Sequence, residues 1–293
     1  MARKRKTRNA ESEDGEDENR SGSVLEGAKE EHPAVNNRSS EDGRHGFVVP
    51  YNGKEIICES QGGSPEDQPA LVFTHGAGGG IDNPATQDFA RGFADVSSIV
   101  CFQRKGNIQS RTNAYGAVIE HHQQATALGG RSMGARAAVI AANENTNVRA
   151  LVLVSYPLIG GKKGDFRDQI LLDIREGVDV LFITATRDTM CPAGDLADVR
   201  AKMSANSWLV EVEGADHGMS VKDKEGAEPI RMRTGAIAAE WLRNRDELRQ
   251  YCSIEWDLDS KSVLSGGWIQ KEESKIDTPS PSEPPKSKRR KKT

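Results

Sequence analysis

Short apolar runs recur along the middle of this chain, and a stretch with helical spacing lies between each run and the next. The runs are rich in β-branched residues and are apolar on both faces, as are strands buried on both sides of a parallel sheet. They cover residues 70–74, 98–102, 150–156, 178–184 and 208–212. The helical patterns cover residues 85–95, 113–122, 133–143, 194–204 and 230–249. This alternation predicts an α/β fold with an open, doubly wound, mostly parallel sheet.

An antiparallel hairpin is predicted to precede the alternating region. Residues 47–51 and 54–59 read as two strands, and the dipeptide Asn52-Gly53 lies between them. Asn-Gly is favoured in the type I′ turn, which joins two antiparallel strands tightly. The sheet is therefore expected to carry an antiparallel hairpin at its N-terminal side.

The segment before Gly129 departs from the pattern of strong apolar runs. Residues 125–128 are Ala-Thr-Ala-Leu, and the four residues before them are the polar His-His-Gln-Gln. A strand of about five to six residues is usual, so this strand is expected to be unusually short. Either it is a stub, or residues are missing here, as they would be after mis-splicing.

The two ends of the chain differ in composition from its middle. The mean hydropathy of −0.64 is low for a fully folded chain of 293 residues. Residues 1–45 are acidic and polar after a basic start, and residues 271–293 are rich in proline and lysine. We expect both to be disordered tails, around an α/β domain at 46–250 and a C-terminal extension at 251–270.

Charge and apolar content limit the classes of partner and location. The net charge is −4, but residues 46–270 carry −6, and no aromatic residues are interleaved with the basic runs. Direct nucleic-acid binding is therefore not expected. Membrane insertion and secretion are not expected either, because the chain has no run of about 20 apolar residues and its basic start leads into acidic residues. The basic clusters at 3–8 and 286–292 predict nuclear localisation, with solvated tails of a cytoplasmic protein as the alternative. The four cysteines lack disulfide or metal spacing, and we expect them to be buried thiols.

Ser132 lies in a pattern that is typical of a nucleophile elbow. Gly130 and Gly134 flank it at positions i−2 and i+2, and an alanine-rich helical stretch follows. At such an elbow the chain leaves a buried strand and enters a helix through one strained residue whose hydroxyl faces outward. The five-residue pattern alone is weak, because glycine and serine are both common.

A candidate acid and a candidate base follow Ser132 in chain order. Asp188 lies in the loop that leaves the strand-like run at 178–184. His217 lies in a glycine-flanked loop after the last predicted strand. Taken singly, Asp188 reads as a turn or cap residue and His217 as a surface histidine. Serine acyl transfer needs a base to accept the hydroxyl proton and an acid to orient that base. Together the three residues predict a Ser-Asp-His triad.

A glycine-rich loop after the first parallel strand is a candidate oxyanion hole. Thr74 is followed by His-Gly-Ala-Gly-Gly-Gly. The amide of Met133 would supply one donor, and that of Ala77 or, as the second choice, Gly76 would supply the other. A phosphate-binding loop is the alternative, but the run lacks the P-loop ending and dinucleotide-fingerprint spacing. His75 is expected to tether the loop.

No metal or cofactor site is predicted from the sequence. His121 and His122 are adjacent and would point to different helix faces, and no spaced group of histidines and cysteines is present. Arg131 and Arg136 flank Ser132, and we expect an ion pair at the rim of the site. The alternative is that Arg131 contacts an acidic substrate.

Several segments resemble the α/β-hydrolase-like family that groups a testis-expressed protein with the third subunit of the non-specific-lethal histone acetyltransferase complex. The resemblance covers about residues 70–245, and the stretch before Gly129 looks shorter than in that family. The matching segments are 74–79, 102–107, 129–137, 155–158, 181–183 and 186–191. It implies an α/β-hydrolase fold and, as an alternative function, a non-catalytic adaptor with protein partners in a nuclear chromatin complex.

The main functional prediction is a serine hydrolase without a cofactor. Only about twenty residues separate Leu158 from Val178, too few for the helical lid of a lipase. A pocket without a lid suits a small acyl ester or thioester. Ser132 would attack, His217 would move the proton and Asp188 would hold the imidazole.

Overall fold

The structure is a computed structural model that describes residues 43–122, 125–161 and 165–270. The described residues fall within one compact unit. The predicted disordered tails and both basic clusters lie outside them, except that the first strand begins at Arg44, within the range predicted as tail.

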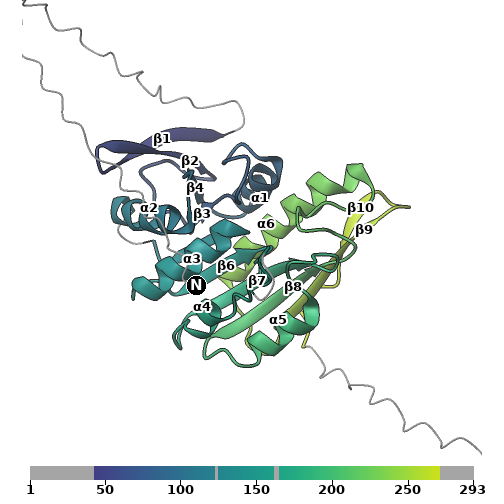
Figure 1. Cartoon of the computed structure of the whole chain (residues 1–293). Helices are drawn as coiled ribbons and strands as arrows, with labels where there is room; N and C mark the ends of the chain where they lie inside the picture. The colour runs from purple at the N-terminus through teal and green to yellow at the C-terminus, as the bar shows by residue number, and fades with distance from the viewer. Residues whose placement is uncertain (1–42, 123–124, 162–164, 271–293) are drawn as a thin grey trace, which may run out of the picture. The chain divides into compact units, whose positions relative to one another are not determined.

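The described chain forms a ten-stranded sheet whose strand order is β1-β2-β4-β3-β5-β6-β7-β8-β9-β10 (Figure 1). Its middle, from β4 through β3 to β9, is parallel, and the strands at both ends pair antiparallel. The strands are β1 (Arg44–Tyr51), β2 (Lys54–Gln61), β3 (Leu71–Thr74), β4 (Ile99–Gln103), β5 (Ala127–Arg131), β6 (Ala150–Val154), β7 (Asp179–Ala185), β8 (Asn206–Val212), β9 (Tyr251–Asp257) and β10 (Ser262–Ser265). The predicted mostly parallel sheet is confirmed.

The predicted N-terminal hairpin is also confirmed. β1 and β2 pair antiparallel in full register, with Tyr51 opposite Lys54. Asn52 and Gly53 both have positive φ, at 48° and 68°, as the type I′ turn requires.

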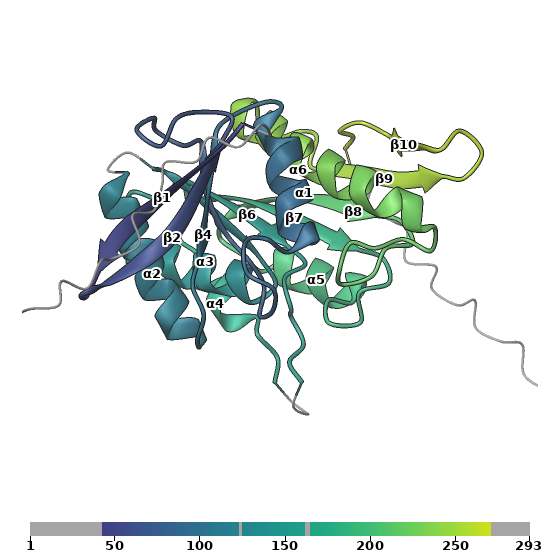
Figure 2. The same ribbon diagram turned by 90° about the horizontal axis from the view of Figure 1, so that it is seen from above.

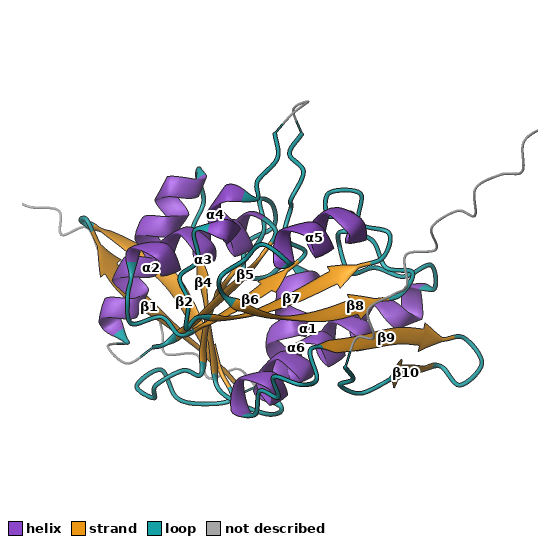
Figure 3. Cartoon of the chain, turned by 90° about the horizontal axis from the view of Figure 1, so that it is seen from below, coloured by secondary structure: helices purple, strands orange, loops and turns teal. Residues whose placement is uncertain are grey.

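Helices cover both faces of the sheet. α1 and α6 pack on one face, and α2, α3, α4 and α5 pack on the other (Figures 2 and 3). Their bounds are α1 (Pro84–Ala94), α2 (Ile108–His121), α3 (Met133–Glu144), α4 (Gln169–Leu172), α5 (Ala193–Arg200) and α6 (Ala227–Arg243), with a short 3₁₀ turn η1 (Lys224–Gly226) before α6. Each face buries its own apolar cluster, so the doubly wound arrangement follows from strands that are apolar on both sides.

A capping residue accounts for one of the helix boundaries that the apolar pattern missed. The Asn107 side chain accepts a hydrogen bond from the Ser110 amide at 2.9 Å, so α2 begins at Ile108 and not near 113. An asparagine cap satisfies an amide that the first helical turn leaves free. α5 ends at Arg200, earlier than predicted, and α6 covers Ala227–Arg243 and not 230–249.

The expectation of a stub strand before the elbow is wrong. β5 runs from Ala127 through both glycines to Arg131 and pairs in parallel with β3 and β6. A Cβ on Gly129 would lie 2.7 Å from the Val152 carbonyl oxygen and 3.0 Å from the Phe73 ring. The Tyr115 hydroxyl donates to the Gly129 carbonyl from α2. The strand was underestimated because glycines in a crowded sheet centre carry no apolar signal.

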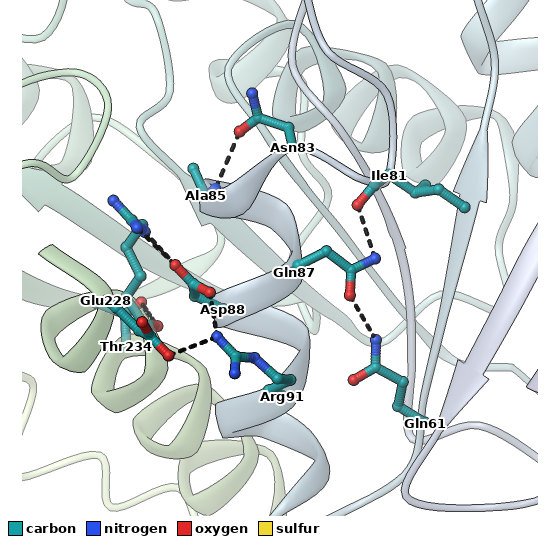
Figure 4. A network of polar contacts seen from close by, with 10 residues as sticks. Gln61, Ile81, Asn83, Ala85, Gln87, Asp88, Arg91, Glu228 and Thr234 are labelled. Carbon is teal, nitrogen blue, oxygen red and sulfur yellow. Dashed lines mark hydrogen bonds and ion pairs between the residues drawn. The ribbon is translucent and has the colours of Figure 1, made fainter. Parts of the chain in front are cut away.

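α1 and α6 cross at small residues, and polar side chains close the contact. A Cβ on Gly92 of α1 would lie 1.8 Å from the Met232 carbonyl oxygen of α6, so the two backbones touch there. Beside this crossing Asp88 accepts from Arg91 and from Arg231, and Arg91 also donates to Glu228 (Figure 4). A 2.6 Å ion pair joins Asp88 to Arg231. The Asp88 side chain is 7% exposed, so its charge is compensated within the contact.

The C-terminal extension adds two strands to the sheet. β9 pairs in parallel with β8, and β10 pairs antiparallel with β9. The alternation in β9 places Cys252 and Ile254 in the core, which is the period-two pattern of a strand with one face buried. This alternation was present in the sequence and was not used to predict strands.

Candidate active site

Ser132 occupies the sharp turn between β5 and α3. Its φ of 53° and ψ of −115° place it in a strained backbone region that few residues other than glycine adopt. A Cβ on Gly130 would lie 2.4 Å from the Gly134 carbonyl carbon, and one on Gly134 would lie 2.6 Å from the Thr74 carbonyl oxygen. Both glycines are therefore required by close backbone contacts at this turn, which is the geometry of a nucleophile elbow.

The structure brings Ser132, His217 and Asp188 into one hydrogen-bonded line. His217 Nε2 lies 2.9 Å from Ser132 Oγ, and His217 Nδ1 lies 2.7 Å from Asp188 Oδ2. The Asp188 side chain is fully buried, whereas that of His217 is 28% exposed. With Asp188 ionised, Nδ1 carries the proton and donates to Oδ2, and this leaves Nε2 free to accept the Ser132 proton.

Loops at the carboxyl ends of β7 and β8 hold the acid and the base. Asp188 Oδ1 accepts from the Met190 amide at 2.9 Å. This bond fixes the carboxylate so that Oδ2 faces His217. Asp216 Oδ1 accepts from the amides of Gly218 and Ser220 at 2.8 and 3.0 Å. These two bonds close the turn that carries His217. Asp188 is thus both the turn residue of the alternative interpretation and the partner of the histidine.

Arg131 connects the end of β5 to the His217 loop. Its Nη2 donates to the His217 carbonyl oxygen at 2.8 Å. Burial lowers the pKa of this guanidinium, although Asp216 and Asp188 nearby act in the opposite direction. The predicted rim ion pair is not formed: within the described ranges neither Arg131 nor Arg136 makes a salt bridge, and Arg131 contacts a backbone carbonyl instead. The sequence places Arg131 beside the serine but gives no sign of this contact.

The loop after β3 packs directly against the elbow. A Cβ on Gly76 would lie 3.5 Å from the Ser132 Cβ, so the glycine lets the two segments approach. Met133 supplies the first amide of α3. Among the described residues the amides of Met133, Gly76 and Ala77 donate to no acceptor. All three candidate donors of the predicted oxyanion hole are therefore free at this place.

Hydrogen bonds to two carbonyl groups fix the orientation of this loop. The His75 ring donates through Nδ1 to the Gly76 carbonyl at 2.7 Å, and His75 Nε2 lies 3.3 Å from the Arg104 amide, from which it accepts. Arg111 Nη1 donates to the His75 carbonyl at 2.8 Å from α2. Because the N–H of a trans peptide points opposite to its C=O, these bonds turn the amides of Gly76 and Ala77 away from His75 and Arg111. Arg111 was not identified from the sequence, since its position in α2 gives no sign of burial.

His75 is neutral in this arrangement, which agrees with its predicted tethering role. Burial, together with the charge of Arg111, lowers its pKa from 6.5 to about 4. A protonated imidazole could not accept from the Arg104 amide, so the neutral form is the one that holds the loop.

The pKa of His75 leads to a predicted loss of stability in mild acid. Between pH 6.5 and about 4 the unfolded chain binds a proton at His75 and the folded chain does not. The free energy of unfolding should be fully retained above pH 6.5 and fall by about 3 kcal/mol from this residue as the pH is lowered to 4. Urea unfolding of wild type and His75→Gln across this range measures it. Equal pH slopes in both proteins would show that His75 does not titrate in this way.

Neither a metal-binding cluster nor a membrane-spanning helix is found among the described residues. No group of three or more histidine, cysteine, aspartate or glutamate side chains lies close enough there to hold a metal ion. No helix in the described ranges is long and apolar enough to cross a membrane.

Comparison with known proteins agrees with the observed fold. A family profile for the alpha/beta hydrolase domain matches residues 67–240, which is more than half of the chain. The fold is similar to that of Est1E from Butyrivibrio proteoclasticus, with a TM-score of 0.54 and 14% identity over 68% of this chain and 99% of that one. A thioesterase domain from the curacin biosynthetic pathway gives a TM-score of 0.53 and 14% identity over 69% and 99%.

A third solved structure of the same fold is an alpha-beta serine hydrolase homologue from Coxiella burnetii. It gives a TM-score of 0.51 and 16% identity over 66% of this chain and 96% of that one. The strand order, the elbow between β5 and α3, and the profile match lead to one conclusion. This chain belongs to the α/β-hydrolase domain family.

Proposed function

We propose that this protein is a serine hydrolase that cleaves a small acyl ester or thioester through Ser132. The single observation that carries the proposal is the unbroken line from Asp188 through His217 to Ser132, at 2.7 and 2.9 Å. A structural serine needs neither a buried carboxylate behind a histidine nor a strained backbone. Both features have a cost in stability that an enzyme offsets with activity.

The proposed reaction begins when His217 Nε2 takes the proton from Ser132 Oγ as the oxygen attacks the acyl carbonyl. Asp188 holds the Nδ1 tautomer and stabilises the imidazolium that forms. The free amides of Met133 and Ala77, with Gly76 as the alternative second donor, bind the oxyanion of the tetrahedral intermediate. His217 then gives its proton to the leaving alkoxide or thiolate, and water repeats the cycle on the acyl enzyme.

The connection after β6 supports a small substrate. Its described residues form only α4 and an isolated bridge between Ile159 and Phe166, so they contribute no helical cap over Ser132. Two proteins of similar fold are named as an esterase domain and a thioesterase domain. We infer the same broad reaction class for this chain, in which water takes the acyl group from an oxygen or a sulfur.

Membership of the narrower group with the testis-expressed protein and the chromatin-complex subunit belongs to the same proposal. It depends on the segments around Ser132 and Ser155, and nuclear localisation depends on the basic clusters at 3–8 and 286–292. Deletion of both clusters should leave the protein cytoplasmic. An unchanged nuclear signal after that deletion would contradict the localisation.

Turnover of short acyl esters tests the proposed activity. Wild type should hydrolyse p-nitrophenyl esters and acyl thioesters of short chain length, and Ser132→Ala should lose this activity by about four to six orders of magnitude. Circular dichroism and urea unfolding confirm that the variant is folded. Equal rates for the folded variant and wild type would show that Ser132 is not the nucleophile.

A further inference from the structure

Arg136 lies one helical turn beyond Ser132 on the partly exposed face of α3. The helix buries Gly134, Ala135 and residues 137–139, and it leaves Met133 and Arg136 partly exposed. Four residues advance a helix by about 6 Å, and helical side chains lean toward the N-terminal end. The Arg136 side chain therefore leans toward the end of α3 that carries Ser132.

The guanidinium of Arg136 has no partner within the described part of the chain. It forms no hydrogen bond or salt bridge there, and its Nε is completely buried without an acceptor. Burial lowers the pKa of this group, and the nearby charge of Arg167 lowers it further. A buried donor without a partner costs about 1–3 kcal/mol, and more when it is charged. Asp165 nearby acts on this pKa in the opposite direction, but no hydrogen bond or salt bridge in the described part of the chain uses the guanidinium.

The segment after β6 brings a second guanidinium to the same place. Arg167 donates through Nη2 and Nε to one oxygen of Asp165, at 2.6 and 3.1 Å. A Cβ on Gly160 would lie 1.7 Å from that oxygen, so the glycine makes room for the pair. The Ile159 amide donates to the Met190 carbonyl at 2.8 Å, which ties this segment to the loop that carries Asp188. Arg136, Arg167 and Asp165 thus lie near one another at the catalytic edge.

We propose that Arg136 binds an anionic group, a carboxylate or a phosphate, on the substrate whose acyl group is transferred to Ser132. This inference rests on the proposed hydrolase function and narrows its substrate class to anionic acyl esters or thioesters. A planar guanidinium with free N–H groups pairs well with either oxyanion. The structure places this charge on the helix of the nucleophile, so the anion and the scissile carbonyl would belong to one molecule.

Two pairs of matched substrates separate the possible sources of the negative charge. The first pair is p-nitrophenyl pentanoate and the mono-p-nitrophenyl ester of glutaric acid, which differ by a carboxylate on the acyl group. The second pair is pentanoyl-coenzyme A and S-pentanoylpantetheine, which differ by the phosphates, together with the adenosine, of the leaving group. Ser132→Ala provides the blank for spontaneous hydrolysis.

The measured quantity is the ratio of kcat/KM for the anionic substrate to that for its neutral partner. Arg136→Gln should lower this ratio about 10- to 100-fold for one of the two pairs, as expected for loss of a charged hydrogen bond. Arg136→Lys should restore part of it. Arg149→Gln removes an exposed arginine directly before β6, at the opposite end of this strand from the catalytic edge, and should leave the ratio unchanged. Equal ratios in wild type and Arg136→Gln for both pairs would overturn the inference.

Calorimetry separates failure of the subsite from failure of the hydrolase function. If Ser132 proves unreactive, the hydrolase proposal fails, and titration of wild type with glutarate and with coenzyme A still tests the anion site. Binding that Arg136→Gln abolishes would support an anion site without catalysis. No binding of either compound to wild type, or equal binding to the variant, would refute it.

Discussion

Asp188→Asn is expected to lower kcat for a short acyl ester by about 10,000-fold while the protein stays folded. In the wild type, Asp188 Oδ2 accepts the proton of His217 Nδ1 at 2.7 Å. An asparagine amide can present an N–H at this position, and the imidazole would then carry its proton on Nε2, where it cannot accept from Ser132. Steady-state kinetics with a p-nitrophenyl ester measure the loss.

Asp216→Asn is the matched control for this substitution. Asp216 is adjacent to His217, and its Oδ1 caps the amides of Gly218 and Ser220. An asparagine oxygen can keep both bonds, so the variant removes a nearby charge but leaves the turn intact. Its kcat should stay within about threefold of wild type, because an exposed charge is worth little. Similar losses in the two variants would mean that Asp188 acts only through general electrostatics.

Gly92→Ala is expected to lower the free energy of unfolding by about 3 kcal/mol, the largest single-methyl effect we predict. The added Cβ would lie 1.8 Å from the Met232 carbonyl oxygen and 2.5 Å from its carbon. These are backbone atoms of α6, so no side-chain rotation relieves the clash and the two helices must separate. Urea or thermal unfolding measures the loss.

Gly116→Ala tests the same substitution in a helix where the added methyl has space. No atom lies within 4 Å of a Cβ at Gly116, which is exposed on α2. The helix propensity of alanine should raise the free energy of unfolding by about 0.5–1 kcal/mol. If Gly92→Ala were as well tolerated as Gly116→Ala, the close crossing of α1 and α6 would be wrong.

The parts of the fold that follow from burial could be predicted from the sequence. β6 and β7 are continuous apolar runs because both faces are covered by helices, and their positions were predicted to within two residues at each end. β5 could not be predicted in the same way. Close contacts with Val152 and α3 require glycine at positions 129 and 130. These contacts exist only in the folded chain, so the sequence pattern does not reveal them.

The candidate site followed from chain order, but its supporting contacts did not. Asp188 and His217 each come after a parallel strand, and parallel strands bring their carboxyl ends to one edge of the sheet. That rule places the groups near Ser132 but gives no distance. The bonds from Arg131 to the His217 carbonyl and from Arg111 to the His75 carbonyl join segments far apart in sequence, and long side chains leave no periodic signal.

Covalent labelling of Ser132 tests the central claim most directly. Wild type treated with a fluorophosphonate should gain one phosphonyl group per chain, and peptide mass mapping should place it on Ser132. Ser132→Ala should gain none, and His217→Ala should react far more slowly, because the base at 2.9 Å from the hydroxyl is gone. A folded wild-type protein that gains no adduct, or gains it at another residue, would contradict the account.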